Sequence, residues 1–277
     1  MAKKNGVKVR QFIRESAAAL KIIMQEHLAE IADNMVEQIR KNLERATPSQ
    51  RVNAVNGVKP VGEQSYRADV LLAFSVIANE AIAMARKEVP KAKKAKLSDF
   101  DKLPKDVQKQ IKQQAKFLVG TQLADLAKNL FFQFDSSFDS TDSTAQIIDD
   151  LYDSADDYIK GVAISSGSGS LAAKVINDAR NAFFFDNDVL EEIAAFEFYN
   201  GDPVSEICTD LAGTIFAKDD PNAFRYTPPL HFNCKSTILP ILVGDPKANQ
   251  IEDLKPSSKR IEDTIQFHEH NKYCSHS

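Results

Sequence analysis

Residues 7–43 of the chain read VKVRQFIRESAAALKIIMQEHLAEIADNMVEQIRKNL, and their pattern determines the architecture of the N-terminal half. The apolar residues recur at spacings of three and four, which places them on one face of a helix. No proline interrupts this pattern before Pro48. Because a helix this long is rarely stable alone, its apolar stripe must be buried against the following helices or against a partner protein. The stripe consists of Val9, Phe12, Ile13, Leu20, Met24, Leu28, Ile31, Met35, Ile39 and Leu43.

The same spacing predicts four more helices further along the chain. The polar stretch at residues 49–65 contains glycine and proline and indicates a loop, and the second helix ends near Pro90. The stretch SSGSGS, residues 165–170, is expected to be a flexible boundary before the last helix. The four predicted helices span about 66–89, 104–134, 147–162 and 171–185.

The pattern changes to that of short strands after residue 185. Phe196 and Phe198 alternate with polar or charged neighbours, which is typical of a strand. A second short strand is predicted around Ile215, and a third at STILPILV, residues 236–243. Pro240 lies inside the third strand, and because proline cannot donate a ladder hydrogen bond, we expect this strand at an edge or a bend.

The sequence therefore predicts a mainly α protein in which a long helical N-terminal region precedes a small α+β module. Hydrophobic residues make up 43% of the chain and charged residues 27%, which argues against wholesale disorder. The predicted parts are a helical region at 1–164, the module at 171–243 and a polar, flexible tail at 244–277.

Composition also indicates in which cellular compartment the protein is expected. No apolar run approaches the ~18–20 residues that a membrane span needs, so we expect no membrane partner. The basic N-terminus lacks the apolar region and cleavage site of a signal peptide, so secretion is not indicated. The chain has three cysteines, which are too few for a disulfide framework and cannot all be paired within the chain. This favours a reducing compartment.

The net charge of −4 conceals two halves of opposite sign. Residues 1–134 hold 24 Lys and Arg against 14 Asp and Glu, a net of +10, whereas residues 135–277 hold 11 against 25, a net of −14. A basic half can lie near DNA or an acidic partner, and its excess charge recognises phosphate without reading sequence. The alternative is that both halves are simply solvated helix faces that attract each other.

Two clusters of charged residues can each be interpreted either as a solvated surface or as a binding site. Lys91, Lys93, Lys94 and Lys96 form either a solvated linker or a phosphate-contacting patch, and no interleaved aromatic residue supports base stacking. Five aspartates follow one face of the fourth predicted helix without a loop that would wrap a cation, so a solvated face is favoured over a metal site. They are Asp149, Asp150, Asp153, Asp156 and Asp157.

Residues 201–243 form the most informative stretch for chemistry. No P-loop, GxGxxG, GxSxG or HExxH motif is present. Cys208 is separated by about 22 residues from the pair His231 and Cys234, a spacing that brings a thiolate, an imidazole and a second thiolate together across two loops. This ligand set suits a structural zinc ion. The alternative is a knot of turns in which the three side chains pack without metal.

The fourth ligand of such a site is not evident. Ser205 occupies the position where a C-x-x-C pair would place a cysteine. Asp202, Asp210 or Cys274 are substitutes, and the tail around Cys274 is metal-competent by composition although such tails are often functionally silent. That tail also holds His268, His270 and His276.

The stretch from Gly201 to Val243 resembles the Mu F-like head morphogenesis family, the minor head proteins of tailed bacteriophages. That family's module has an Asp, a C-x-x-C pair, x-x-L-D-G, a short strand, an insert, and P-P-x-H-x-x-C-R-C/S before a further strand. The preceding helix, with Asn177 and Arg180, is similar to the helix before the module in relatives. The departures are Ser205 for a first Cys, Lys235 for Arg, and Ser236 where many members have another Cys. The matching residues are Asp202, Cys208, Leu211, Gly213, Phe216, Pro228, Pro229, His231, Asn233, Cys234, Ser236 and Thr237.

The resemblance covers residues 171–243 and implies a non-enzymatic virion component. Family members are made in few copies, enter the procapsid with the portal protein, and lie inside the head near the portal. It implies a role in head morphogenesis, DNA packaging and ejection, with the portal, the major capsid or scaffold protein and packaged DNA as partners. The host cytoplasm would then be the compartment during assembly.

Two other classes of function stay open. Mu F-like modules also occur beside toxin domains, and a zinc-dependent hydrolase or nuclease would centre on His231 and Cys234. No general base or open metal position is evident for such an enzyme, and no large domain follows residue 243. The other class is a basic helical DNA-binding protein that uses Lys91 to Lys96.

Overall fold

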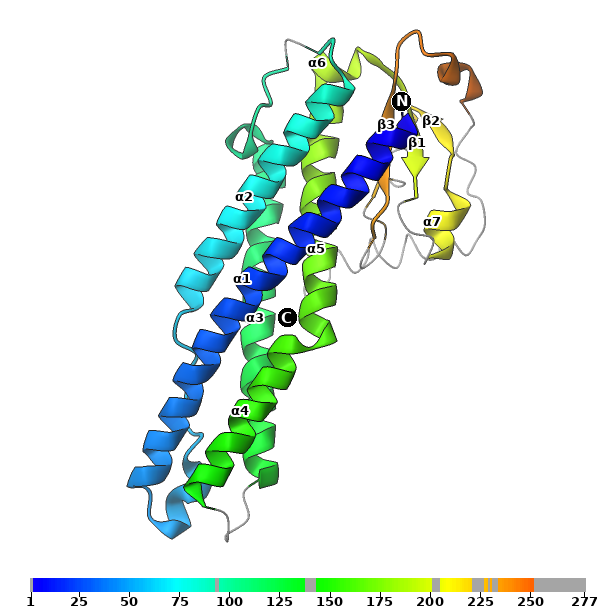
Figure 1. Ribbon diagram of the computed structural model, residues 1–277. Coiled ribbons are helices and arrows are strands. Elements are labelled where there is room, and N and C mark those ends of the chain that lie inside the picture. Colours follow the sequence, from blue (N-terminus) through cyan, green and yellow to red (C-terminus); the bar gives the residue numbers. More distant parts are fainter. Residues whose placement is uncertain are drawn as a thin grey trace. The chain divides into compact units, whose positions relative to one another are not determined.

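The computed structural model describes residues 2–92, 95–137, 143–200, 205–220, 227–228, 230 and 234–251. Five of its helices are longer than sixteen residues, and a small antiparallel sheet follows them (Figure 1). The predicted fold class, mainly α with a small α+β region, is confirmed. The elements are α1 (Ala2–Arg45), α2 (Glu63–Glu88), α3 (Lys105–Ser137), α4 (Thr144–Lys160), α5 (Val162–Phe184), α6 (Asn187–Leu190), β1 (Ile193–Tyr199), α7 (Glu206–Asp210), β2 (Ile215–Ala217) and β3 (Thr237–Leu242), with 3-10 turns at Pro48–Asn53, Phe100–Lys102 and Pro246–Gln250.

The stripe on the first helix is buried within the chain itself. Val9, Leu20 and Leu28 of α1 are fully buried, as are most other members of the stripe. Of the two choices left open by the sequence, burial against the chain's own helices is therefore the one observed. The helix begins and ends close to the predicted limits because its spacing of apolar residues is regular throughout.

The flexible conformation expected at residues 165–170 is wrong, although the boundary expected there does coincide with the division of the chain into two compact units between Ser168 and Gly169. These residues are helical and lie inside α5. Serine and glycine have weak helix propensity, but Ile164, Ala172 and Val175 on the same helix are fully or almost fully buried. Packing of this buried face outweighs the local preference, because most helix stability in proteins comes from tertiary contacts.

The chain divides into two compact units. We call Met1–Ala17, Phe74–Gln110 and Gly169–Ser277 the sheet unit, and Ala18–Ala73 and Ile111–Ser168 the helical unit. The predicted division into 1–164, 171–243 and 244–277 stays a prediction.

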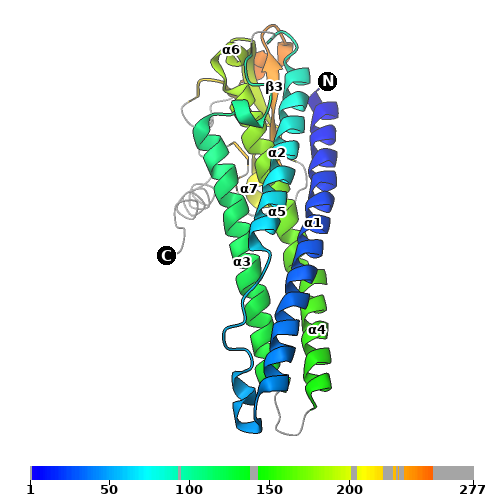
Figure 2. The same cartoon turned by 90° about the vertical axis from the view of Figure 1, so that its left-hand side faces the viewer.

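The helical unit contains all of α4, the first residues of α5 and parts of α1, α2 and α3, and α1 to α4 lie side by side (Figure 2). The Tyr66 hydroxyl donates to Oε1 of Gln122, and both side chains are buried. The Gln122 side chain also reaches Met24 Sδ at 3.6 Å, and the Tyr158 hydroxyl donates to the Gln122 carbonyl at 3.2 Å. These polar contacts within an apolar core fix how four helices, α1 to α4, meet, because each buried polar group needs its partner.

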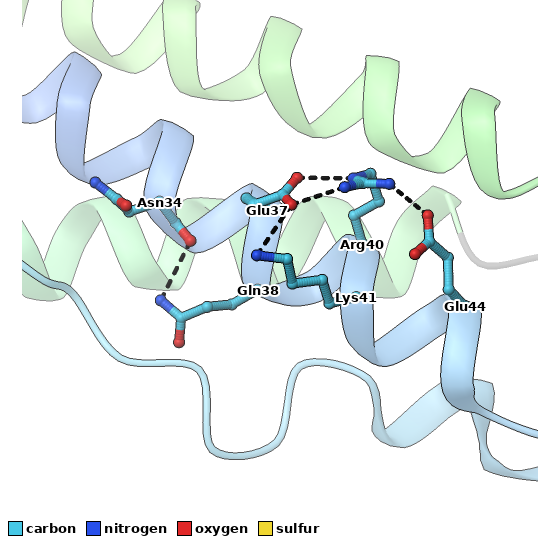
Figure 3. A network of polar contacts seen from close by, with 6 residues as sticks. All are labelled: Asn34, Glu37, Gln38, Arg40, Lys41 and Glu44. Atoms are coloured by element: carbon cyan, nitrogen blue, oxygen red, sulfur yellow. Dashed lines mark hydrogen bonds and ion pairs between the residues drawn. The ribbon is translucent and has the colours of Figure 1, made fainter.

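Exposed charges on α1 in the helical unit pair along the helix (Figure 3). The Arg40 guanidinium donates from Nε and Nη2 to the two Glu37 carboxylate oxygens at 2.7 Å, and it also pairs with Glu44. Lys41 Nζ lies 3.2 Å from Glu37. The hydrogen bonds from Arg40 and then Lys41 lower the pKa of Glu37 from 4.5 to about 2. These spacings of three and four residues are those at which helical side chains meet.

The sheet unit contains three antiparallel strands in the order β2-β1-β3 (Figure 1). Phe196 of β1 lies opposite Phe216 on one side and Pro240 on the other. β3 is an edge strand, as Pro240 predicts. Gly213 has a φ of +81°, which a residue with a side chain rarely adopts, and it forms the turn that leads into β2.

Helix α2 bears on the expectation that no apolar run in this chain approaches the length of a membrane span. Among the described residues, it is the one helix that is long and apolar enough to cross a membrane, by length and composition alone. Its apolar residues include Val70, Phe74 and Ile82, all fully buried in this chain. A core helix with an apolar buried face passes the same test of composition.

Candidate functional site

The segments singled out by the sequence meet in the sheet unit. Cys208 lies in α7, a single helical turn that begins after Ser205, and Cys234 lies two residues before Ser236 at the entrance to β3. Both cysteines are 1% exposed. Their Sγ atoms are 3.7 Å apart although 26 residues separate them in sequence. The short helix and the segment before β3 are therefore in direct contact through two sulfur atoms.

Hydroxyl groups complete the surroundings of the Cys208 sulfur. The hydrogen bond with the Cys234 thiol, together with burial, raises the pKa of Cys208 well above its usual range. Hydrogen bonds with Ser236 and Ser205 act in the opposite direction, because a hydroxyl donor stabilises the thiolate. The cluster thus holds two sulfurs and two hydroxyls from two segments.

Helix α5 binds the backbone before β3 through two amide side chains, one buried and one half-buried. Asn177 is fully buried, and its Nδ2 donates to the Ser236 carbonyl at 3.0 Å. One turn later, Asn181 Nδ2 donates to the Pro228 carbonyl at 3.1 Å. These contacts bind two backbone carbonyls that lie before β3, so side chains of α5 help to position the chain at Pro228 and Ser236.

A buried ion pair lies on the same face of α5. Arg180 is fully buried, and its Nη1 and Nη2 donate to the two Glu88 carboxylate oxygens at 2.7 and 3.1 Å. Nη2 also lies 3.3 Å from the Ile238 carbonyl of β3. The guanidinium carbon is 5.0 Å from the centre of the Phe184 ring. One side chain therefore joins α2, α5 and β3 through charge, a backbone contact and a ring contact.

An aromatic cluster continues from this pair into the sheet. The ring centres of Phe184 and Phe196 are 6.0 Å apart, and those of Phe196 and Phe216 are 5.9 Å apart. All three rings are fully buried. Such tilted pairs lie within the range at which aromatic rings attract one another, so α5 and the sheet share one apolar core.

The predicted metal ligands are only partly described. Cys208 and Cys234 are brought together, whereas His231 lies outside the described residues. Asp202 and the tail residues Cys274, His268, His270 and His276 also lie outside them. Asp210 is exposed at the end of α7. Within the described residues, no group of three or more His, Cys, Asp or Glu side chains forms a metal site.

The acidic face of α4 in the helical unit borders an open hollow of about 520 Å³. Asp153 and Asp157 are exposed, as the sequence predicts for a solvated face, and Asp156 pairs with Lys160. The hollow is lined by Asn129, Gln133, Asp150, Asp153, Ser154, Asp157 and Tyr158.

Comparison of the chain with protein-family models, with curated proteins and with solved structures gave no match. The site is therefore interpreted from its own geometry and from the resemblance of residues 171–243.

Two positioning residues escaped the sequence analysis. Glu88 was not recognised as the partner of Arg180, because the two are 92 residues apart and Glu88 is only the last residue of an apolar helix. Asn181 carries no motif of its own. Asn177 and Arg180 were found through the resemblance, and both contact the segment that enters β3.

Proposed function

We propose that the protein is a minor head protein of a tailed bacteriophage that acts without catalysis. It enters the procapsid with the portal protein, stays inside the head near the portal, and serves head morphogenesis and the packaging or ejection of DNA. Its partners are the portal, the major capsid or scaffold protein, and packaged DNA that it contacts without sequence preference.

The observation that carries the proposal is the contact between Cys208 and Cys234. The resemblance rests on two short motifs, and it requires that they belong to one structural element. Their sulfurs are 3.7 Å apart, and Asn177 and Arg180 bind the backbone at Ser236 and Ile238. These buried contacts join the two motifs into one structural element, and this supports a structural role for the module.

Helix α3 offers a surface for a protein partner in the helical unit. Phe117 and Phe132 are 71% and 74% exposed. They are separated by fifteen residues, or about four helical turns, so they face broadly the same side. Because the apolar stripe of α1 is buried in the chain, these exposed rings are the better candidates for docking on the portal.

Contact with DNA is expected to be electrostatic. Residues 1–134 carry the net charge of +10, and Lys91 and Lys96 are exposed. A protein that only neutralises phosphates loses affinity steeply as salt rises. We therefore expect the full chain to bind duplex DNA of unrelated sequences equally, with a steep loss of affinity as the salt concentration increases.

The assembly role is tested in a phage whose genome carries this reading frame. A nonsense mutation is complemented with the wild-type chain, with F117S/F132S, or with V243S as a matched control at an exposed apolar residue of the other unit. We expect the double variant to fold, by circular dichroism, but to be missing from purified procapsids and to give few infectious particles. V243S should behave as wild type.

The outcome that overturns the proposal is clear from the nonsense mutant alone. If heads assemble, package and eject DNA normally without the chain, the protein has no role in head morphogenesis. If such heads fail and hydrolysis of DNA or peptide by the purified chain also depends on Cys234, the enzymatic alternative replaces the structural one.

A further inference from the structure

Helix α3 carries a row of lysines along one side. Successive members are separated by four, three and four residues, and this spacing keeps them on one face of a helix. All of them are exposed. The first and last members are eleven residues apart, which is about 16 Å along the helix axis. We call this row the α3 lysine stripe, and it consists of Lys105, Lys109, Lys112 and Lys116.

The charges of the α3 lysine stripe are not neutralised within the described residues. None of the four lysines forms an ion pair or a side-chain hydrogen bond in the part of the chain that the structure describes. Lysines on other helices do find a carboxylate one turn away. Lys41 of α1 pairs with Glu37, and Lys160 of α4 pairs with Asp156. The stripe therefore differs from the other exposed charges by having no internal partner.

This arrangement works against the stability of α3 itself. Like charges three or four residues apart on a helix repel each other and destabilise it. Lys105 also lies in the first turn, where the helix dipole disfavours a cation. Asp106 is the only acidic residue between positions 105 and 124, so α3 offers little compensation. A bound polyanion would relieve this repulsion, because it brings negative charge to all four lysines.

We propose that the α3 lysine stripe binds the phosphate backbone of double-stranded DNA. Each strand of a duplex presents one phosphate per about 3.4 Å of axis, so a stripe of about 16 Å faces about five phosphates of one strand. Lysine is depleted in protein–protein interfaces but is a regular contact of phosphate oxygens, which favours DNA over an acidic protein. The choice of DNA as the polyanion rests on the proposed function, and the site is distinct from the linker lysines Lys91 to Lys96.

The residues around the α3 lysine stripe suit a contact with the DNA backbone. Gln110 and Gln113 are exposed and uncharged, and glutamine amides can donate to phosphate oxygens. Phe117 follows Lys116 in sequence and therefore lies about 100° further around the helix. The stripe and the exposed rings are thus two separate surfaces of one helix, and DNA on the stripe leaves the rings available to a protein partner.

The test measures how binding of the full-length chain to duplex DNA depends on salt. Affinity falls with salt by a logarithmic slope of about −0.9 per neutralised phosphate, so four contacts contribute about −3.6, or about a 150-fold loss between 50 and 200 mM salt. K105Q/K109Q/K112Q/K116Q should make the slope shallower by about this amount on two duplexes of unrelated sequence. The matched control K91Q/K93Q/K94Q/K96Q removes the same charge from the linker and should leave the slope nearly unchanged.

Thermal unfolding separates binding from a structural role of the lysines. Without DNA and at low salt, the stripe variant should be at least as stable as the wild type, because it has lost a repulsion. Duplex DNA should raise the unfolding temperature of the wild type and of the linker variant, since a ligand of the folded state stabilises it. The stripe variant should show a much smaller rise.

Four results would overturn the proposal. They are failure of the wild-type chain to bind duplex DNA at 50 mM salt, a wild-type slope in the stripe variant, loss of the slope in the linker variant instead, and stronger competition by poly-L-glutamate than by unlabelled duplex at equal charge. The last result would assign the stripe to an acidic protein. None of the four bears on whether phage heads assemble without the chain, so the assembly role is tested separately.

Discussion

The two units are specified in different ways. The helical unit is defined by many apolar residues at regular spacing, with one buried polar knot around Gln122. The sheet unit depends on a few buried polar side chains, led by Asn177 and Arg180, that bind backbone and one carboxylate. An apolar core tolerates exchange of one apolar residue for another of similar volume, whereas a buried charge cannot lose its partner without a large cost. The comparison predicts that single substitutions of buried polar residues cost most in the sheet unit.

The largest effect is expected from Arg180→Ala. The substitution leaves the Glu88 carboxylate, 5% exposed, without its cation. Removing one partner of a buried pair costs about 3–5 kcal/mol of unfolding free energy. Urea unfolding followed by circular dichroism measures this loss.

A double variant separates charge from packing at this pair. Because replacing both partners with apolar residues is often neutral, R180M/E88L should recover most of the stability lost in R180A. If R180A unfolds at the wild-type urea concentration, the ion pair does not hold the sheet unit together and the contrast between the units fails.

A smaller effect is expected in the helical unit from Tyr66→Phe. The change removes the hydroxyl that donates to Gln122 and leaves a buried amide oxygen without its donor. Such an orphaned acceptor costs about 1–3 kcal/mol. Y66F/Q122L, which removes both groups and keeps the Gln122 backbone contact with Tyr158, should recover much of the loss in the same urea experiment. A larger cost for Y66F than for R180A would reverse the ranking of the two units.

Sequence pattern predicts the parts of the fold that depend on repetition. The stripe on α1 and the edge position of β3 follow from spacing and from Pro240, because each is a local property of the chain. The helical conformation of residues 165–170 does not follow, since it depends on neighbours that bury Ile164 and Val175. At these residues local propensity favours a loop, whereas tertiary packing favours a helix, and the helix is observed.

The sequence predicts only those residues of the site that belong to recognisable motifs. Cys208 and Cys234 stand out by residue type and spacing, and Pro228 by the stiffness of two adjacent prolines. Glu88 and Asn181 act through contacts that join segments 92 and 47 residues apart. No local signal encodes such pairings, because they arise from the packing of α5 against other elements.

Gly167→Ala should give a small gain in stability. Gly167 lies within helix α5, and a methyl group added there meets nothing within 4 Å. Alanine in a helix interior is favoured over glycine by about 0.5–1 kcal/mol. The matched control is G161A, where the added methyl group would lie 3.0 Å from the Tyr158 carbonyl and should lower stability. Thermal unfolding of both variants measures these changes. A G167A chain that is no more stable than wild type, or that fails in phage complementation, would contradict a purely helical role for residues 165–170.

The smallest effect concerns the exposed network on α1, which is the counterpart of the buried Arg180–Glu88 pair (Figure 3). In a titration followed by nuclear magnetic resonance, the Glu37 carboxyl should have a pKa of about 2, and R40A should move it back toward 4.5. Because the folded-state pKa is lowered, the stabilisation is present above pH 4.5 and is lost as the pH falls toward 2. Exposed pairs are screened by salt, so 1 M salt should shrink the shift, and R40A should lower the urea midpoint at neutral pH far less than R180A does. A wild-type Glu37 pKa near 4.5, or an unfolding midpoint lowered as much by R40A as by R180A, would mean that burial does not decide which ion pairs matter in this chain.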